Sequence, residues 1–288
     1  ELQGAPTLSL PLYRDRAVAA AHAEEVASIP GLVLGAYCGV AVTPRCAGVV
    51  VGSDASAEAE DALDALFAAA ASRSLDVDLH IDETNEPASC VLLPCCKALA
   101  RARAAGFRGH VVLGHATSLS LQPPLIREQV ISQLRLLGPL TVVVNPFTNL
   151  GLMDRRGTSP PVGADIDATA PRTPQWRGLT LMQELRAAGV PLAASSDNVR
   201  DFWEPFGSDY DCLAVWRLVV AIGHLDTAPS PGHWADLVST SAAAACAAQP
   251  ALIGAGSPAD LVLFPSARRL SELFARPQSD RLPLPPGR

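Results

Sequence analysis

The 288-residue sequence is short of several residue types, and each shortage excludes a class of protein. Lys97 is its only lysine and the net charge is −7, so the chain lacks the basic face that sequence-independent nucleic-acid binding requires. No run approaches the ~20 apolar residues of a membrane span. The seven cysteines are irregularly spaced, which argues against a disulfide framework and favours a reducing compartment. We therefore expect an intracellular protein, cytoplasmic or plastid and not secreted, without nucleic-acid or membrane partners.

The composition and the hydrophobic pattern favour a folded α/β protein. Hydrophobic residues make up 49% and charged residues 18% of the chain, which supplies a core and excludes intrinsic disorder. Short apolar runs alternate with longer Ala/Leu/Arg-rich stretches, the pattern of βα units around a parallel sheet. The predicted strands are Thr7–Leu12, Gly31–Tyr37, Asp76–Ile81, His110–Gly114, Leu140–Asn145, Val190–Ser195 and, last, Asp260–Phe264. The predicted helices are Arg14–Ala27, Ser56–Ser74, Cys90–Ala105, Leu125–Leu137, Thr180–Ala188, Cys212–His224 and Trp234–Ala247.

The number of βα units helps to distinguish a closed barrel from an open sheet. Six strands alternate with helices, whereas a closed (β/α)₈ barrel needs eight. An open nucleotide-binding sheet could accept six, but no strand-to-helix turn carries G-x-G-x-x-G or G-x-x-x-x-G-K-[ST]. The pattern therefore favours a (β/α)₈ barrel without its first two strands, over residues 1–247. We expect residues 248–288 to hold the last part of a small β-domain and a Pro-rich tail.

Polar side chains collect where the predicted strands end. These residues are Asp78, His80, Asp82, Glu83, His115, Asn145, Asp197 and Asn198. The carboxyl ends of barrel strands form the rim on which barrel enzymes build their active sites. Imidazoles and carboxylates on one rim suit a hydrolytic divalent metal that keeps one coordination position open for water. Because side chains alternate along a strand, Glu83 cannot share the face of His80, and we expect it past the strand end, folded back over the barrel mouth.

The order and spacing of several motifs extend this interpretation. The motifs are His80-Ile-Asp-Glu83-Thr, Gly114–Leu119, Asn145–Leu150, Trp176–Thr180, Ser196–Gly207 and Gly256–Phe264. With them, the chain from Asp76 onward resembles the amidohydrolase superfamily and, within it, the cytosine deaminase type. The resemblance implies one divalent metal ion, iron or zinc, ligated by His80 and Asp197. It also implies hydrolytic removal of ammonia from a cyclic amidine, such as cytosine or a related pyrimidine.

The same resemblance implies roles for the remaining strand-end residues. Glu83 would carry protons between the attacking water and a ring nitrogen, and His115 would hydrogen-bond the attacking hydroxide. Asp197 would also accept the proton of the water. Asn198 and Trp203 match positions that line the substrate pocket, although Trp203 fits a core aromatic equally well. Lys97 lies in a predicted helix, away from the place of the carboxylated lysine of two-metal relatives, so we expect a single metal.

One departure from the family pattern leaves alternatives open. The family supplies two more metal ligands from a His-x-His pair on its first strand, and this sequence contains no such pair. We therefore expect an absent N-terminal segment and no activity from the 288-residue chain alone. The alternatives are a hydrolase of another C–N bond, or a catalytically inactive relative that serves as an interaction or regulatory subunit. The expected partner is a small-molecule substrate, and a homo-oligomer is possible.

Overall fold

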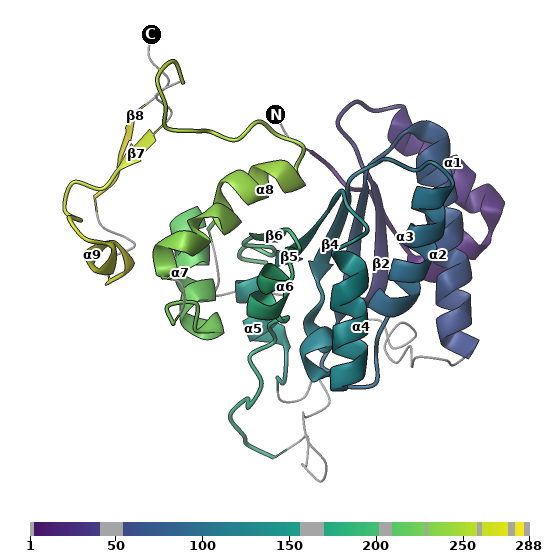
Figure 1. Ribbon diagram of the computed structural model, residues 1–288, viewed down its shortest axis with the longest axis horizontal. Helices are drawn as coiled ribbons and strands as arrows, with labels where there is room; N and C mark the ends of the chain where they lie inside the picture. Colours follow the sequence, from purple (N-terminus) through teal and green to yellow (C-terminus); the bar gives the residue numbers. More distant parts are fainter. Residues whose placement is uncertain are drawn as a thin grey trace.

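The computed structural model describes residues 3–40, 54–155, 170–201, 209–227, 230–257, 261–275 and 280–284. A parallel sheet of six strands forms its centre, and each strand pairs with the next one along the chain (Figure 1). The strands are β1 (Thr7–Ser9), β2 (Leu34–Val40), β3 (Val77–Glu83), β4 (Val111–His115), β5 (Leu140–Val144) and β6 (Leu192–Ala194). The predicted six-stranded α/β sheet is thus confirmed. Because all six strands are parallel, their carboxyl ends lie at the same edge of the sheet.

Helices connect the strands and cover the sheet. The helices are α1 (Arg16–Ala27), α2 (Asp54–Arg73), α3 (Leu92–Ala104), α4 (Pro124–Leu134), α5 (Pro146–Leu152) and α6 (Met182–Ala187). Short 3₁₀ helices, η1 (Leu10–Arg14) and η2 (Thr117–Leu121), follow β1 and β4. The Asp15 side chain accepts the backbone N–H groups of Ala17 and Val18, and this cap starts α1. Helices α1 to α4 lie together beside the sheet (Figure 1).

The core lies between the sheet and this helical layer. Leu79 and Ile81 alternate along β3 and are fully buried, as are Leu63 and Phe67 of the alanine-rich helix α2. All four belong to one continuous cluster of buried apolar side chains. This cluster fixes which face of each strand points to the helices, so the other face is left for the polar side chains of the site.

Some predicted boundaries are wrong. The first strand stops at Ser9 and not at Leu12, since Pro11 cannot donate to a strand ladder and the chain turns into η1. The predicted helix Trp234–Ala247 is two elements, η3 (Pro231–Val238) and α8 (Thr240–Ala245). Ser239 separates them because its φ of −132° and ψ of −98° are not helical.

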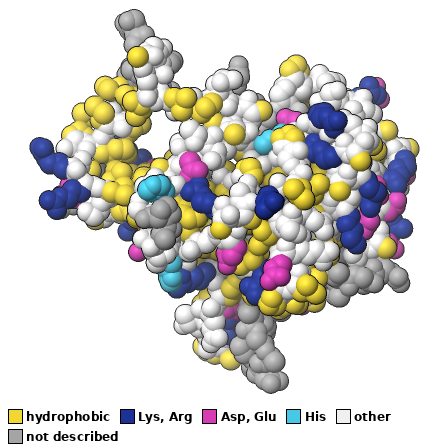
Figure 2. Space-filling model, viewed as in Figure 1, with side chains coloured by type: hydrophobic (Ala, Val, Ile, Leu, Met, Phe, Trp, Pro, Cys, Tyr) yellow, Lys and Arg dark blue, Asp and Glu magenta, His cyan; other side chains and the backbone are white. Residues whose placement is uncertain are grey.

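The C-terminal part holds helix α7 (Cys212–Gly223), strand β7 (Leu261–Leu263), helix α9 (Leu270–Ala275) and strand β8 (Leu282–Leu284). β7 and β8 form an antiparallel pair separate from the main sheet. A second strand was not predicted in the Pro-rich tail, but Pro283 takes part in the pair opposite Val262. Hydrophobic side chains gather on the surface of this region (Figure 2), and Val262 and Leu282 are each 52% exposed.

Barrel closure stays a prediction. Among the described residues, β1 and β6 are the two edges of the sheet and do not pair with each other. The small β-domain and the domain boundary at residue 247 also stay predictions, because the β7–β8 pair alone establishes neither. None of the described helices is both long and apolar enough to cross a membrane.

Candidate active site

The candidate site lies at the carboxyl ends of β3 to β6, beginning with His80 and His115. His80 is in register with Tyr37 of β2 and Gly114 of β4, in the middle of the sheet. The ring centroids of His80 and His115 are 5.1 Å apart, and His115 Nε2 lies 3.2 Å from His80 Nδ1. Two imidazoles from neighbouring strands therefore meet on one face of the sheet.

Glu83 joins this pair because the alternation of side chains along β3 is interrupted before it. Its Oε1 lies 3.5 Å from His115 Nδ1, and the side chain is 11% exposed. The expectation that Glu83 lies past the strand end is wrong, because β3 runs through Glu83 and pairs it with Val40. The simple alternation fails at Asp82, whose φ of 51° is left-handed. That one residue turns Glu83 onto the face that His80 occupies.

His115 contacts two side-chain amides, one from Asn145 directly after β5 and one from Asn149 on α5. Asn149 Nδ2 lies 3.0 Å from His115 Nδ1, and Asn145 Nδ2 lies 3.3 Å from both ring nitrogens. His115 is 1% exposed and has a φ of 72°, an uncommon backbone conformation for this residue type. Asn149 was not predicted as a site residue. Its place in the Asn145–Leu150 motif was the only signal, since its contact with His115 depends on α5.

Asp197 reaches the site from the loop that follows β6. Its Oδ2 lies 3.9 Å from His115 Nδ1, and its backbone has a φ of 58°. Its N–H donates to Ser195 Oγ over 3.1 Å, and Ser195 Oγ in turn donates to Asn145 Oδ1 over 3.0 Å. The Oδ2 atom is buried and makes no hydrogen bond within the described ranges. A buried carboxylate oxygen without a partner is costly unless a cation or a donor completes it.

Burial and mutual repulsion shift the protonation of these groups. Burial, with the nearby Asp197 charge, raises the pKa of Glu83 to about 8, although His80 opposes the shift. Burial lowers the pKa of His80, and the second imidazole lowers it further. Burial also lowers the pKa of His115, against the opposing effect of Asp197. Both imidazoles are therefore favoured in the neutral form, which is the form that binds metal ions.

The donor set fits a divalent metal ion. Ligand atoms of His80, Glu83 and His115 all lie within 4.8 Å of one another, and the carboxylate of Asp197 lies beside them. Imidazole nitrogen and carboxylate oxygen are ligands of zinc and of non-haem iron. The carboxylate in this three-residue cluster is Glu83, whereas the resemblance implied Asp197 as the carboxylate ligand. Which of the two carboxylates binds the metal therefore stays a prediction.

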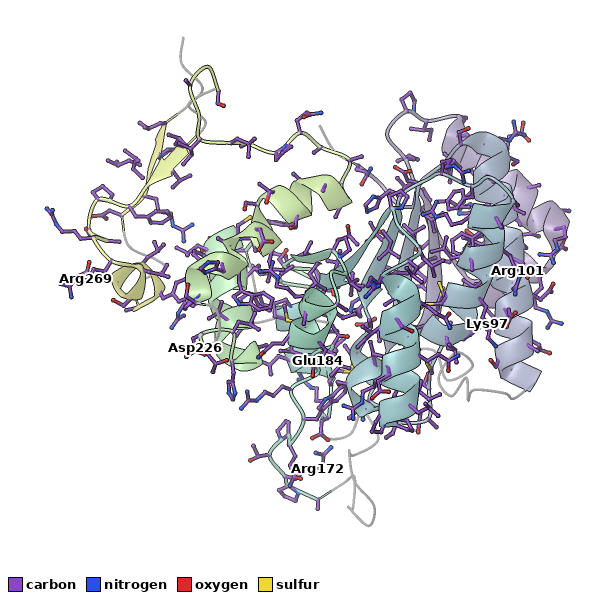
Figure 3. The ribbon with its side chains drawn as sticks, viewed as in Figure 1. Lys97, Arg101, Arg172, Glu184, Asp226 and Arg269 are labelled. Carbon is purple, nitrogen blue, oxygen red and sulfur yellow. The ribbon has the colours of Figure 1, made fainter. Side chains whose placement is uncertain are left out.

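The remaining predicted residues are placed as follows. Asn198 donates its N–H to Thr148 Oγ1 over 3.1 Å and its Nδ2 to Asp201 over 2.5 Å, at the edge of the site. Trp203 lies outside the described residues. Lys97 lies on α3 among the outer helices (Figure 3), where its Nζ is 3.8 Å from Glu60. Its placement on the helical layer agrees with the expectation that it takes no part in the site.

The chain is similar in sequence to a known deaminase. The chain is 41% identical over 228 residues to a pterin deaminase from Rhizobium rhizogenes, across 78% of this chain. It spans about half of that relative, 47% of its length.

Two solved structures share the fold. A 5-methylcytosine deaminase from Klebsiella pneumoniae, liganded with phosphonocytosine, has a TM-score of 0.65 at 19% identity. The match covers 96% of this chain and 68% of that one. An N-isopropylammelide isopropylaminohydrolase from Burkholderia multivorans has a TM-score of 0.57 at 20% identity, covering 98% and 68% of the two chains.

The family itself is given by the sequence. Residues 36–284 match the amidohydrolase family, from β2 through the C-terminal strand pair. This range contains His80, Glu83, His115 and Asp197, and the predicted resemblance to the amidohydrolase superfamily is confirmed. The chain belongs to the amidohydrolase family.

Proposed function

We propose that this chain is the catalytic part of a metal-dependent hydrolytic deaminase that acts on a heterocyclic amidine. The observation that carries the proposal is the meeting of His80, Glu83, His115 and Asp197 at one end of the sheet, with distances of 3.2 to 3.9 Å around His115. The 41% identity to a pterin deaminase supports the same reaction class.

One divalent ion, iron or zinc, would be held by His80 and Asp197, with Glu83 as the competing carboxylate. When bound, such an ion lowers the pKa of water from 15.7 to about 7 and so supplies a nucleophile at neutral pH. The Oδ2 of Asp197, which makes no hydrogen bond among the described residues, and the neutral imidazole of His80 suit that purpose.

The side chains of the site perform the proton transfers. Water adds to the ring carbon that bears the exocyclic amine, and Asp197 accepts a proton from that water. Glu83 delivers a proton to the adjacent ring nitrogen. Asp197 then passes its proton to the amine, which leaves as ammonia, and the proton of the new hydroxyl returns to Glu83 as the carbon becomes a carbonyl. His115, held by Asn149, donates a hydrogen bond to the attacking oxygen. General acid–base catalysis of this kind contributes about 10²–10⁴-fold.

For the substrate we propose a pterin first and cytosine or a related pyrimidine second. Both rings contain an amine on a carbon that is bonded to a ring nitrogen, so the same proton path serves either. The sequence similarity to a pterin deaminase favours the larger ring. The likeness to a 5-methylcytosine deaminase structure, at 19% identity, supports the fold and leaves the pyrimidine as the second candidate. Asn198 and Trp203 are the residues we propose to line the substrate pocket.

The test is ammonia release from pterin and from cytosine, with Fe²⁺ or Zn²⁺, by the 288-residue chain and by the same chain extended with an N-terminal segment that contains a His-x-His pair. We expect the extended chain to release ammonia from at least one ring, to lose activity with a chelator and to recover it on metal addition, and the 288-residue chain alone to release none. Bound metal in the extended chain without ammonia release from either ring would contradict the deaminase proposal.

A second candidate is an inactive relative that acts as an interaction or regulatory subunit. The 288 residues contain no His-x-His pair, from which the family takes two ligands, and a longer chain that also lacked the pair would support this candidate. Under this alternative the longer chain binds neither Fe²⁺ nor Zn²⁺ and forms a complex, with itself or another protein. Metal content measured on the longer chain therefore separates the two candidates before any substrate is known.

A further inference from the structure

Asp82 lies between two residues of the candidate site and has an unusual backbone. Strict alternation along β3 would put Asp82 on the same face as His80 and Glu83 on the opposite one. The φ of 51° at Asp82 reverses this order for the last two residues of the strand. A left-handed conformation at a residue with a side chain costs free energy, so surrounding contacts must maintain it.

The Asp82 carboxylate supplies the first set of these contacts. Its Oδ1 accepts the N–H of Val91 over 2.8 Å and its Oδ2 accepts the N–H of Leu92 over 2.9 Å. Both donors are at the start of α3, whose first N–H groups have no partner within the helix. The side chain is fully buried. The carboxylate therefore ties the end of β3 to the helix beside the sheet and points away from the site.

Thr117 supplies the second set from the segment that follows His115. Its hydroxyl lies 2.8 Å from the backbone oxygen of Asp82 and 3.1 Å from that of Thr84, and it accepts the N–H of Thr84 over 3.1 Å. Thr117 is fully buried. One side chain thus holds the backbone on both sides of Glu83.

We propose that Asp82, together with Thr117, is a positioning residue for Glu83: the clamp of Asp82 on α3 maintains the left-handed turn that directs the Glu83 carboxylate toward His115. This assignment rests on the proposed deaminase function, in which Glu83 carries protons. Asp82 itself touches no substrate. Its effect passes through the 3.5 Å contact between Glu83 and His115, which a relaxed β backbone at residue 82 would break.

The central test compares Asp82→Asn with a control, Asp15→Ala. Asp15 also accepts two backbone N–H groups at a helix start, those of Ala17 and Val18, both through its Oδ1, on α1 outside the site. Asp82→Asn replaces one of two accepting oxygens and Asp15→Ala removes the accepting oxygen of the α1 cap, so both lower thermal stability. We expect only Asp82→Asn to reduce kcat, by about 10²-fold, because small misplacements of a reacting group have effects of that size. The KM for substrate and the metal content stay within threefold of wild type.

A second measurement does not depend on activity. Crystal structures of the wild-type chain and of Asp82→Asn give the distance from Glu83 Oε1 to His115 Nδ1 directly. We expect it to lengthen by more than 1 Å in the variant. The values of kcat are measured in the chain extended with a His-x-His segment; if that wild type releases no ammonia, the proposed function fails while this distance still decides the positioning role. An unchanged distance, or an equal loss of kcat in Asp15→Ala, would overturn the proposal.

Thr117→Val provides the variant to use if Asp82→Asn does not fold. It removes the hydroxyl that lies against Asp82 and Thr84 and keeps the shape and the apolar part of the side chain. We expect the same pattern, a reduced kcat with retained metal, and a longer Glu83–His115 distance. Unchanged kcat and unchanged distance in folded Thr117→Val would count against the proposal as well.

Discussion

The two ends of the six-stranded sheet are built on opposite principles. At the amino ends of β4 and β5, a single guanidinium satisfies backbone carbonyls. Arg103 donates to the carbonyl oxygens of Leu137, Phe107, Gly109 and Pro139, over 2.8 to 3.3 Å. At the carboxyl ends, two buried polar atoms of the site make no hydrogen bond among the described residues, and three site residues have left-handed backbones. The amino ends therefore contribute to the stability of the fold, whereas the carboxyl ends hold the candidate site.

Three residues of the candidate site have a left-handed backbone. Asp82, His115 and Asp197 have φ values of 51°, 72° and 58°, all left-handed. Asn149 Oδ1 and Asp197 Oδ2 are buried and make no hydrogen bond among the described residues. Strain and unpaired polar atoms cost stability, so their grouping at one rim is typical of a functional site. In barrels, this same rim is the one that holds active sites.

The largest expected effect comes from exchanging carboxylates at the carboxyl end. Glu83→Gln should lower turnover about 10²–10⁴-fold, because the amide cannot carry the proton. It should leave metal content unchanged if Asp197 is the ligand, whereas Asp197→Asn should lower metal content. Elemental analysis and ammonia release on the two variants check this. Metal loss in Glu83→Gln with retention in Asp197→Asn would reverse the two roles.

The second-largest expected effect is a loss of stability at the amino ends of the strands. Arg103→Ala should lower the free energy of unfolding by about 2–4 kcal/mol, since it leaves several partly buried carbonyls without a charged donor. Turnover per metal should stay unchanged. Arg101→Ala, two residues earlier on α3, is the matched control. The Arg101 ion pairs with Glu60 and Asp64 are half exposed, so its loss should cost less than about 1 kcal/mol. Chemical denaturation measures both, and equal losses would refute the distinction.

A smaller effect on both ends is expected from glycine substitutions. At Gly178, with a φ of 67°, an added Cβ would lie 2.8 Å from Asn149 O and from Met153. Gly178→Ala should therefore lower stability by about 1–3 kcal/mol and reduce kcat, because Asn149 holds His115. Gly106 has a φ of 104° and open space around it, at the end of α3. Gly106→Ala should show the stability loss alone, about 1–2 kcal/mol. Thermal unfolding and kcat together test the pair.

The smallest effect is a pH dependence at the amino end. Burial lowers the pKa of His110, whose Nε2 lies 3.0 Å from Thr141 Oγ1. The folded state then binds fewer protons than the unfolded state, so stability should rise with pH until the usual histidine value of about 6.5 and then level off. The slope is at most about 1.4 kcal/mol per pH unit for one proton. Unfolding curves between pH 5 and 8 should lose this component in His110→Gln, and an unchanged slope would contradict it.

The sequence alone determined the order of the strands, the family and the strand-end residues. Leu79 and Ile81 alternate with Asp78 and His80, so burial of the apolar pair sends the polar pair to the other face whatever the details of packing. The helix near Arg14–Ala27 was predicted as well, although its start lies at Arg16, after the cap at Asp15. The motifs from His80 to Asp197 identified the family because their spacing follows the βα repeat.

Only the tertiary structure decided the direction of Glu83 and the partners of His115. Alternation placed Glu83 off the face of His80, and the turn at Asp82 that corrects it depends on N–H groups of α3 and on Thr117, nine and 35 residues away. Asn149 likewise meets His115 across 34 residues. Hydrophobic periodicity is a property of neighbours in the chain, whereas a strained backbone persists only where distant groups hold it, and no local pattern records them.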